Sequence, residues 1–420
     1  MTTLLSLVHR IPFPPNKGDK IRSYQLLRQL SSRYRVLLGA FVDYPEDWSQ
    51  AAALDEFCDE VYLLPLRPRL ARLRSLAGLW AREPLTVPYY RDRRMHRWAR
   101  SKFEQGVDKV VVFSSSMAQY ADYREAQDAT RVIDFVDLDS EKWQQYGAHH
   151  SGLLGAVYRR EARLLARYES EMARRFDHSV LVSSQEAKPL QHRCPELAGR
   201  IHAVPNGVDH RYFDPADSLV NPYGANERAV VFTGAMDYQA NVDAVCWFAE
   251  HAWPRIHAAN ANYGFTIVGS RPERAVLALG RLPGIRVTGT VDDVRPYLKF
   301  ASVAVAPMRI ARGIQNKVLE AMAMGLPVVG TAAAVEGLSA DVAACVEQAE
   351  SGEQFAQAAL KLLEAPPSPN RADRNRAAIL RDYDWAENLS LIFDLLDGGS
   401  SAAAAPSTAP SSAAIAPADP

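Results

Sequence analysis

The sequence is poor in cysteine, since its four cysteines (Cys58, Cys194, Cys246 and Cys345) lie far apart in 420 residues. They form no CxxC pair or Cys/His spacing, which argues against a zinc site and a disulfide framework. The formal net charge of -1 shows no basic excess, so we expect no nucleic-acid partner. No apolar run approaches the ~18 residues of a spanning helix. The N-terminal apolar segment is too short for a secretory signal. These absences favour a cytoplasmic protein that is at most peripheral to a membrane.

Short β-branched runs alternate with helical patterns through most of the chain. Such continuous apolar runs are typical of parallel strands covered on both faces, and the alternation indicates βαβ units in an α/β fold. Eleven strands are too many for one such sheet, so we expect two doubly wound domains of five or six strands each. The expected strands are 4–8, 36–41, 61–64, 110–113, 132–136, 179–182, 230–233, 265–268, 285–288, 303–306 and 327–330.

Loop residues at 204–209, with the sequence Val-Pro-Asn-Gly-Val-Asp, predict the boundary between the two domains. We expect an N-terminal domain over 1–205, a C-terminal domain over 206–382 and a final helix over 383–397 that crosses back. The Ala/Ser/Pro composition of 398–420 is typical of a disordered tail. Ser183 and Glu186 form a capping-box pattern and are expected to begin a helix.

The segment Arg309–Gly330 is the most informative part of the sequence. After an expected strand, a polar loop containing Gly313 leads into a helix, which Gly325 ends before the next strand. Lys317 and Glu320 are three residues apart, so they share a face near the helix start. A helix start can bind phosphate through its N–H groups and its dipole. A lysine adds a point charge for phosphate, and an ionised carboxylate can accept both hydroxyls of a ribose.

The segment therefore suits a nucleoside diphosphate, but the residues alone leave a second interpretation open. Lys317 and Glu320 can equally be a surface ion pair, with Gly313 an ordinary loop glycine, because a glycine before a helix is weak evidence.

Several motifs resemble the retaining GT-B glycosyltransferases of family 4, or glycosyl transferases group 1. The pattern K-x-L-E-A-M-A-x-G-x-P-V-V at 317–329 is similar to their donor-site signature. The resemblance extends over most of the chain. It includes the proline-flanked N-terminal loop and residues 182–184, 204–209 and 289–298. A narrower resemblance is to the sugar transferases associated with exosortase/PEP-CTERM systems, which accompany exopolysaccharide synthesis. It rests on two motifs, one formed by residues 232–238 together with 241–243 and the other by residues 14–22.

The resemblance implies two Rossmann-like domains that face a central cleft. It implies transfer of a hexose-type sugar from a nucleotide diphosphate sugar to a glycan or lipid-linked acceptor in exopolysaccharide biosynthesis, with retention. It also implies that Glu320 binds the donor ribose and that Gly234 opens the first loop of the donor domain. The diphosphate is then bound by Lys317 and by the backbone of Gly313, Ile314, Gln315 and Asn316.

The sequence departs from the family pattern in two places. Arg312 occupies the position of a glutamate that usually contacts the donor sugar, eight residues before Glu320. No cation follows Gly234 in the stretch 235–241, where the family often has an Arg and a Lys aimed at phosphate. We infer that Arg312, with Arg309, supplies the missing positive charge, because a guanidinium can grip phosphate with two hydrogen bonds.

The N-terminal loop is a second candidate binding element. It follows the first strand, and Asp19 can cap the helix that is expected to begin near Lys20. Ligands of open α/β domains bind at the carboxyl edge of the sheet. The resemblance places Gly18 against the donor or acceptor, with Lys17, Asp19 and Arg22 nearby. The alternative is an ordinary turn between strand and helix.

Two residues are candidates for catalysis. Asp137 lies where the expected strand 132–136 ends, and it can orient an acceptor hydroxyl, whereas Asp139 serves equally well as a helix cap. His9 follows the first strand, although a lone histidine is often structural. The resemblance implies front-face attack, so catalysis would be mostly positioning and electrostatic stabilisation of the leaving diphosphate. No cofactor and no metal are expected, since no Asp-x-Asp motif lies in a donor loop.

A basic stretch runs from Arg67 to Lys102, with eleven Arg or Lys, two acids and four interleaved Trp or Tyr. Such a surface can rest on the anionic inner face of a membrane, at about 1 kcal/mol per basic residue. The alternative is a pair of solvated helices with their side-chain stems packed down.

Two other functions fit the same residues. A nucleotide-sugar epimerase would use the same fold without an acceptor surface. A non-catalytic nucleotide- or glycan-binding partner would suit Arg312 at the glutamate position.

Overall fold

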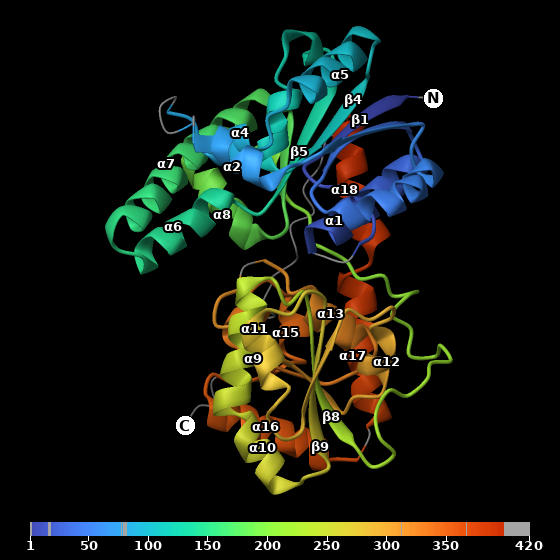
Figure 1. The fold of residues 1–420 in the computed structure, drawn as a ribbon. Coiled ribbons are helices and arrows are strands. Elements are labelled where there is room, and N and C mark those ends of the chain that lie inside the picture. Colours follow the sequence, from blue (N-terminus) through green and yellow to red (C-terminus); the bar gives the residue numbers. More distant parts are fainter. Residues whose placement is uncertain are drawn as a thin grey trace, which may run out of the picture.

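The structure is a computed structural model that describes residues 2–15, 18–76, 78, 82–311, 313–366 and 368–398. The described residues form two parallel sheets, one in each half of the chain (Figure 1). The N-terminal sheet has the order β3 (Glu60–Pro65), β2 (Arg35–Val42), β1 (Thr3–Val8), β4 (Lys109–Phe113), β5 (Thr130–Val136), β6 (His178–Leu181) and β7 (Ile201–Ala203). The C-terminal sheet has the order β10 (Ile285–Gly289), β9 (Tyr263–Val268), β8 (Arg228–Thr233), β11 (Val303–Ala306), β12 (Val328–Gly330) and β13 (Glu347–Gln348).

The two doubly wound sheets confirm the predicted fold class. The prediction of five or six strands in each domain was too low for the N-terminal sheet, which has seven in the described residues. The sequence analysis missed β7 and β13, which are three and two residues long. Strands this short contain too few residues to show a hydrophobic run.

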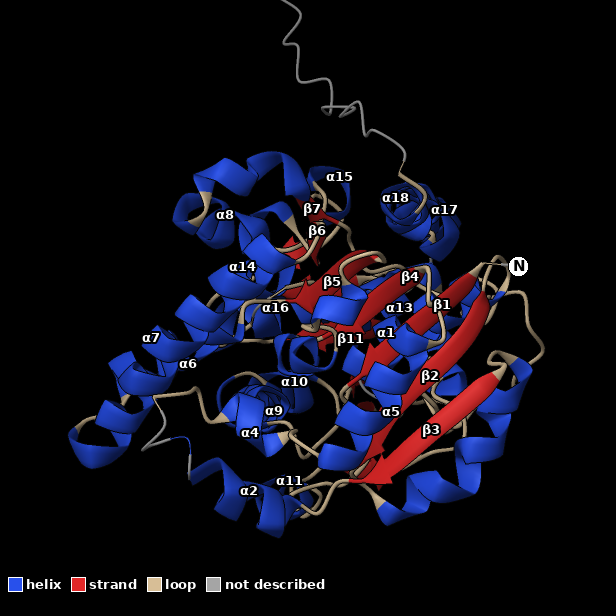
Figure 2. Ribbon diagram, turned by 90° about the horizontal axis from the view of Figure 1, so that it is seen from above, coloured by secondary structure: helices blue, strands red, loops and turns tan. Residues whose placement is uncertain are grey.

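Helices cover both faces of the N-terminal sheet, which Figure 2 shows from above. Neighbouring residues of β1 point into different cores: Leu5 and Leu7 into one cluster, Leu4 and Val8 into the other. This two-sided burial explains why the strand sequence is apolar throughout. The helices are α1 (Gly18–Ser31), α2 (Pro68–Leu76), α4 (Thr86–Tyr89), α5 (Arg93–Glu104), α6 (Asp139–His149), α7 (Gly152–Arg175) and α8 (Ser184–Arg193). The same domain has the 3-10 helices η1 (Pro45–Glu56), η2 (Ser115–Tyr120), η3 (Arg124–Ala126) and η4 (Pro195–Arg200).

The C-terminal sheet is buried in the same way, within one hydrophobic core. Its helices are α9 (Gln239–His251), α10 (Trp253–Ala259), α11 (Arg274–Leu279), α12 (Arg295–Lys299), α13 (Asn316–Ala323), α14 (Ala332–Val335), α15 (Ala340–Ala343), α16 (Gly352–Glu364) and α17 (Pro369–Asp382). Among the described helices, none combines the length and the apolar composition that crossing a bilayer requires.

The last described helix, α18 (Trp385–Leu396), returns to the N-terminal domain (Figure 1). Trp385, Leu389 and Ile392 lie in the same buried cluster as Leu4 and Val36. Residues 399–420, for which the sequence predicts a tail, lie outside the described residues.

Candidate functional site at the interdomain junction

The carboxyl ends of the parallel strands of the two domains meet at the junction between them (Figure 1). The start of α1 faces the start of α13: a Cβ placed on Gly18 would lie 4.0 Å from Asn316 Nδ2. Asn206 Nδ2 donates to Asn316 Oδ1 at 3.3 Å. A Cβ on Gly313 would lie 3.3 Å from Val182 Cγ2 of the N-terminal domain. Two helix N-termini therefore converge on one place, and both favour negative charge.

The first loop of the C-terminal domain begins at Gly234, whose φ of +151° is rarely adopted by residues with a side chain. A Cβ on Gly234 would lie 2.7 Å from Asn241 Nδ2, and a Cβ on Gly269 would lie 1.7 Å from Gly234 O. Asn241 Nδ2 in turn donates to Ala235 O at 2.9 Å. The ends of β8 and β9 thus pack closely, with the backbone of Gly269 against that of Gly234 and the Asn241 side chain against Gly234.

The loop before α13 supplies backbone rather than side chains. Gly313 has φ +62°, and Ile314 is buried in the hydrophobic core, so its side chain is not available to a ligand. Gln315 is the residue immediately before the helix, and Asn316 is its first residue. N–H groups in the first turn of a helix lack carbonyl partners within it, so this turn can bind an anion.

Lys317 and Glu320 lie half-buried on the first turns of α13. Lys317 Nζ donates to Asn241 Oδ1 at 3.0 Å, so α13 and the Gly234 loop share one polar contact. Burial lowers the pKa of Lys317 to about 8, although the charge of Glu320 acts to raise it. Burial raises the pKa of Glu320 to about 7, although the charge of Lys317 acts to lower it. Among the described residues, no group donates a hydrogen bond to the Glu320 carboxylate.

The structure does not test the role inferred for Arg312, because Arg312 lies outside the described residues, as does Lys17. Arg309 is described, and it does not supply free positive charge. Its guanidinium pairs with Asp243 on α9, with Nε 3.0 Å from Oδ2, and its side chain is 52% exposed. The inference that Arg309 helps to bind phosphate is therefore not supported by its position.

On the N-terminal side, His9 lies directly after β1 and contacts Asp19. His9 Nε2 is 3.2 Å from Asp19 Oδ2, and Arg10 pairs with both Asp19 and Asp43. Burial alone would raise the pKa of Asp19, but the hydrogen bond and charge of His9 and the charge of Arg10 hold it below its usual range. His9 stacks on Phe113, and its buried Nδ1 has no hydrogen-bond partner among the described residues.

The expected N-cap role of Asp19 is not what the structure shows. Helix α1 begins at Gly18, earlier than expected, so Asp19 lies in its first turn. Its carboxylate accepts from Arg10 and His9 and therefore orders the loop after β1.

Arg22 lies behind the junction, because its side chain is fully buried. Its Nε donates to Asp134 Oδ2 at 2.7 Å, and one terminal nitrogen donates to Asn206 Oδ1 at 3.0 Å. Since Asn206 contacts Asn316, a continuous series of polar contacts joins the core of the N-terminal sheet to the start of α13. Arg22 thus positions other residues and is not exposed to a ligand.

Asp137 follows a tight turn at the end of β5. Val136 has φ +69°, which is rare for a β-branched residue, and Asp137 N donates to Phe135 O across it at 2.9 Å. Lys142 Nζ is 2.8 Å from Asp137 Oδ1 and 3.4 Å from Asp139 Oδ1. Such strained turns are often found where a side chain must be aimed at a site.

The pKa values of Asp139 and Lys142, at the start of α6, are shifted by burial and by the charges beside them. Burial raises the pKa of Asp139; Lys142 opposes this, and the charge of Asp137 adds to it. Burial alone would lower the pKa of Lys142, but both carboxylates outweigh it and raise the pKa. Tyr238 of the C-terminal domain also contributes to the Lys142 shift, so the cluster lies within electrostatic reach of the opposite domain.

Sequence reasoning missed Lys142, Asn241 and Asn206 as site residues. Lys142 was detectable in part, because it lies three residues after Asp139 at a helix start. Asn241 and Asn206 were noticed only as parts of motifs, since their contacts with Lys317 and Asn316 come from distant parts of the chain.

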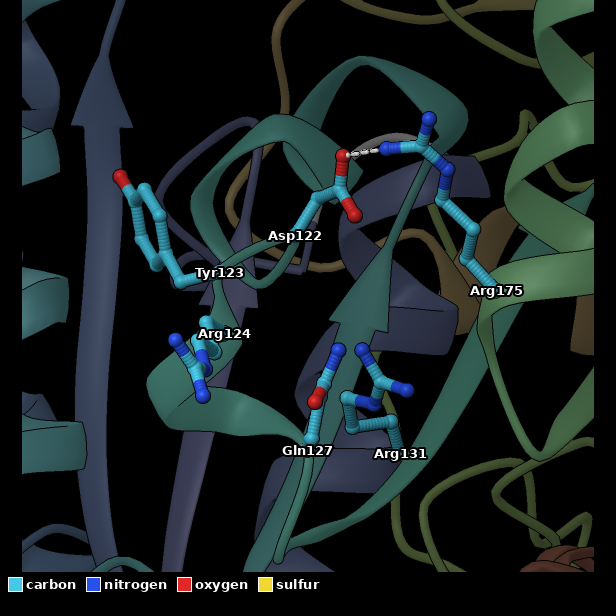
Figure 3. Close-up of a pocket in the computed structure, with 6 residues that line it drawn as sticks. All are labelled: Asp122, Tyr123, Arg124, Gln127, Arg131 and Arg175. Atoms are coloured by element: carbon cyan, nitrogen blue, oxygen red, sulfur yellow. Dashed lines mark hydrogen bonds and ion pairs between the residues drawn. The ribbon is translucent and has the colours of Figure 1, made fainter.

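The described residues contain no group of three or more His, Cys, Asp or Glu side chains that could hold a metal ion. A cavity of about 440 Å³ lies away from the junction, at the opposite edge of the N-terminal sheet, where β5 begins (Figure 3). Its lining residues are Asp122, Tyr123, Arg124, Gln127, Arg131 and Arg175.

Comparison with known proteins finds a family match within the C-terminal domain. Residues 227–365 match the family Glycosyl transferases group 1. A search of curated proteins finds no match.

Solved structures resemble the whole chain. HepE from Anabaena, crystallised with UDP and glucose, is 14% identical with a TM-score of 0.65 over 94% of this chain and 100% of its own. WaaG, a glycosyltransferase of lipopolysaccharide biosynthesis, is 16% identical with a TM-score of 0.64 over 94% and 100%. A putative UDP-N-acetylglucosamine 2-epimerase from Listeria monocytogenes is 13% identical with a TM-score of 0.56 over 95% and 96%. The chain therefore has the GT-B fold, and its C-terminal domain matches the group 1 glycosyltransferases.

Proposed function

We propose that the protein transfers a hexose-type sugar from a nucleoside diphosphate sugar to a glycan or lipid-linked acceptor, with retention of configuration. We further propose that it acts in the cytoplasm, in exopolysaccharide biosynthesis. The observation that carries the proposal is the half-buried Lys317–Glu320 pair at the start of α13, within the segment that matches the glycosyltransferase family. HepE, a protein of the same fold, has been crystallised with UDP-glucose.

In this proposal the C-terminal domain binds the donor. Glu320 accepts hydrogen bonds from the ribose hydroxyls, because its carboxylate has no donor among the described residues. Lys317 and the N–H groups of the loop 313–316 bind the diphosphate. Gly234 opens the loop after β8, and Asn241 at the start of α9 accepts from Lys317 Nζ at 3.0 Å.

The reaction breaks the bond between the anomeric carbon and the diphosphate oxygen and forms a bond from the acceptor oxygen on the same face. The acceptor proton passes to the departing diphosphate. The starts of α1 and α13 and Lys317 stabilise the negative charge that develops there. We assign no metal or cofactor to this step. Asp137 or His9 orients the acceptor hydroxyl from the N-terminal side.

Replacement of Glu320 tests the ribose site. Glu320→Ala should weaken the binding of nucleoside diphosphates by about ten- to a hundred-fold, the loss expected for one charged hydrogen bond of ~1.5–3 kcal/mol. Isothermal titration of the wild type and the variant, with a chelator present throughout, measures this change. The matched control is Glu364→Ala, an exposed glutamate at the end of α16. Equal affinity of the Glu320→Ala variant and the wild type would refute the placement of the ribose.

A turnover assay separates transfer from the other functions of this fold. Release of nucleoside diphosphate that an acceptor accelerates supports transfer. Conversion of the donor sugar to its epimer without an acceptor indicates an epimerase, the activity for which the similar Listeria structure is named as putative. Binding without any turnover indicates a non-catalytic partner.

A further inference from the structure

The basic stretch Arg67–Lys102 does not form one exposed surface. Tyr90 is buried, and Trp98 stacks on Tyr62 and donates from Nε1 to Glu60 at 2.8 Å. Lys102 also pairs with Glu60, at 2.7 Å. These interleaved aromatic rings therefore stabilise the domain internally, and Trp80 lies outside the described residues. Basic side chains remain exposed on α5, at Arg93, Arg94, Arg97 and Arg100, but exposed leucines accompany exposed arginines on helix α2.

Helix α2 exposes a row of leucines to solvent. Leu70, Leu73 and Leu76 are 55%, 65% and 51% exposed, although leucine is among the residues that proteins most often bury. Because they are spaced three residues apart, they follow one side of the helix. The flanking residues Arg67, Arg69 and Arg72 are exposed as well. The helix thus presents apolar and basic side chains together, as helices that lie in a membrane interface do.

The hairpin of α6 and α7 exposes a second apolar group at its tip. Leu153 is 85% exposed and Leu154 is 50% exposed, at the start of α7. Tyr146, near the end of α6, is 41% exposed. Nothing in the fold of the domain requires large apolar side chains at a solvated tip, and clustered exposed apolar residues are typical of interaction sites.

The two apolar groups lie on the same flank of the N-terminal domain. Figures 1 and 2 both draw α2 on the same side of the N-terminal domain as the hairpin. Arg160 of α7 donates to Gly78 O at 2.7 Å, and Gly78 is two residues beyond Leu76. Arg160 is seven residues after Leu153, which is about 10 Å along a helix. The leucines of α2 and those of the tip can therefore contact one extended surface.

The charge of this flank indicates which kind of surface it can bind. Arg159, Arg163 and Arg167 are exposed along α7, whereas its acids Glu161 and Glu169 are buried and its exposed acid, Glu171, pairs with Arg175. No acid in the described residues forms an ion pair with these three arginines or with those that flank the α2 leucines. Arginines without acidic partners around exposed leucines complement an anionic lipid headgroup layer, and they disfavour self-association because two copies would repel each other.

We propose that the face formed by α2 and the tip of the α6–α7 hairpin docks on an anionic lipid bilayer. Leucine side chains insert among the acyl chains, and the surrounding arginines contact phosphate groups. Since α6 begins at Asp139, beside the interdomain junction, docking holds the junction near the bilayer. This inference concerns binding to lipid alone and does not depend on the proposed sugar transfer.

Vesicle co-sedimentation of the full chain tests the proposal without any sugar substrate. Wild-type protein should bind vesicles of equal parts phosphatidylglycerol and phosphatidylcholine, and bind vesicles of phosphatidylcholine much more weakly. The triple variant Leu70→Ser/Leu73→Ser/Leu76→Ser should lose at least about tenfold in affinity. Arg67→Gln/Arg69→Gln/Arg72→Gln should lose roughly a hundredfold at low salt. These side chains are exposed, so the melting temperature should not change.

Matched variants in the C-terminal domain serve as controls. Leu277→Ser/Leu282→Ser removes leucines that are 52% and 44% exposed, and it should leave vesicle binding unchanged. Arg255→Gln/Arg274→Gln/Arg281→Gln removes the same charge from exposed positions and should have little effect. Wild-type binding that is absent, or equal on both kinds of vesicle, would overturn the proposal. So would a leucine variant that binds like the wild type, or one that changes only the oligomeric state seen by sedimentation velocity.

Discussion

The two sides of the interdomain junction are built in different ways. The C-terminal side consists of bare backbone at Gly234, Gly269 and Gly313, with Lys317 and Glu320 as the charged groups on α13. The N-terminal side consists of charged side chains that already hold one another. His9 and Arg10 contact Asp19, and Lys142 bridges Asp137 and Asp139.

This difference indicates what each side can do. A backbone surface with one lysine and one carboxylate binds a ligand of fixed shape and charge, such as a nucleoside diphosphate. Paired acids and bases hold side chains in fixed orientations, which suits the positioning of a hydroxyl and its proton. We therefore expect mutations on the C-terminal side to change donor affinity and mutations on the N-terminal side to change turnover.

The largest effect should come from the N-terminal side. Asp137→Asn or His9→Gln, whichever residue orients the acceptor hydroxyl, should lower kcat by about 10²-fold, because a misplaced hydroxyl attacks the donor less effectively. The affinity for nucleoside diphosphate should stay the same, because neither residue contacts the donor in our proposal. Steady-state transfer rates and titration calorimetry measure the two quantities separately.

Asp128→Asn, an exposed acid in the loop before β5, is the control for both variants. If either variant lowers donor affinity as much as it lowers kcat, the N-terminal side also binds the donor, which contradicts the separate roles that we propose for the two sides. Full activity in both variants would remove His9 and Asp137 from the catalytic proposal.

A smaller effect should follow from filling the backbone surface. In Gly269→Ala, the new Cβ would lie 1.7 Å from Gly234 O, so the ends of β8 and β9 must move apart. We expect the free energy of unfolding to fall by about 1–3 kcal/mol and donor affinity to fall with it. Gly199→Ala is the control, because its Cβ would have no atom within 4 Å. Thermal unfolding measures the stability of both variants, and titration calorimetry measures their donor affinity. If Gly269→Ala matches Gly199→Ala in both quantities, the loop is not tightly packed.

The smallest effect concerns pH. Donor binding in our proposal needs an ionised Glu320 and a protonated Lys317, whose pKa values are about 7 and about 8. Affinity should therefore fall below pH 7 as Glu320 gains a proton, and above pH 8 as Lys317 loses one, by up to about tenfold per pH unit. Asp19 should stay ionised over this range, because its pKa is held below the usual value.

Calorimetry over this pH range measures the profile. Glu320→Ala should abolish the fall on the acid side and keep the fall on the alkaline side. A flat profile for the wild-type protein would contradict the electrostatic description of the donor side.

The fold was largely predictable from sequence because its signals are local. Apolar strands buried on both faces and alternating helices gave the α/β class, and Ser183 caps α8 through Glu186 N as its pattern predicts. The segment that we propose as the donor site is also visible in the sequence, since Gly313, Lys317 and Glu320 lie within eight residues. Strands β7 and β13 were missed because they are held by sheet pairing and not by their own composition.

The N-terminal side was harder to predict because its contacts join distant parts of the chain. Nothing near Arg22 in the sequence shows that Asp134 and Asn206 will surround it. The same holds for Arg309, which is paired by Asp243 from another helix. Long-range ion pairs depend on the folded arrangement, so residue type and spacing alone cannot assign them.

The return of α18 to the N-terminal domain has a consequence for synthesis of the protein. Trp385, Leu389 and Ile392 complete a core that begins with Leu4, so the first domain of the chain lacks part of its interior until the last helix is made. The C-terminal domain, in contrast, has its sheet complete at β13. On the ribosome, the second domain in sequence order can therefore finish folding first, and the N-terminal domain closes only after residue 396 has emerged.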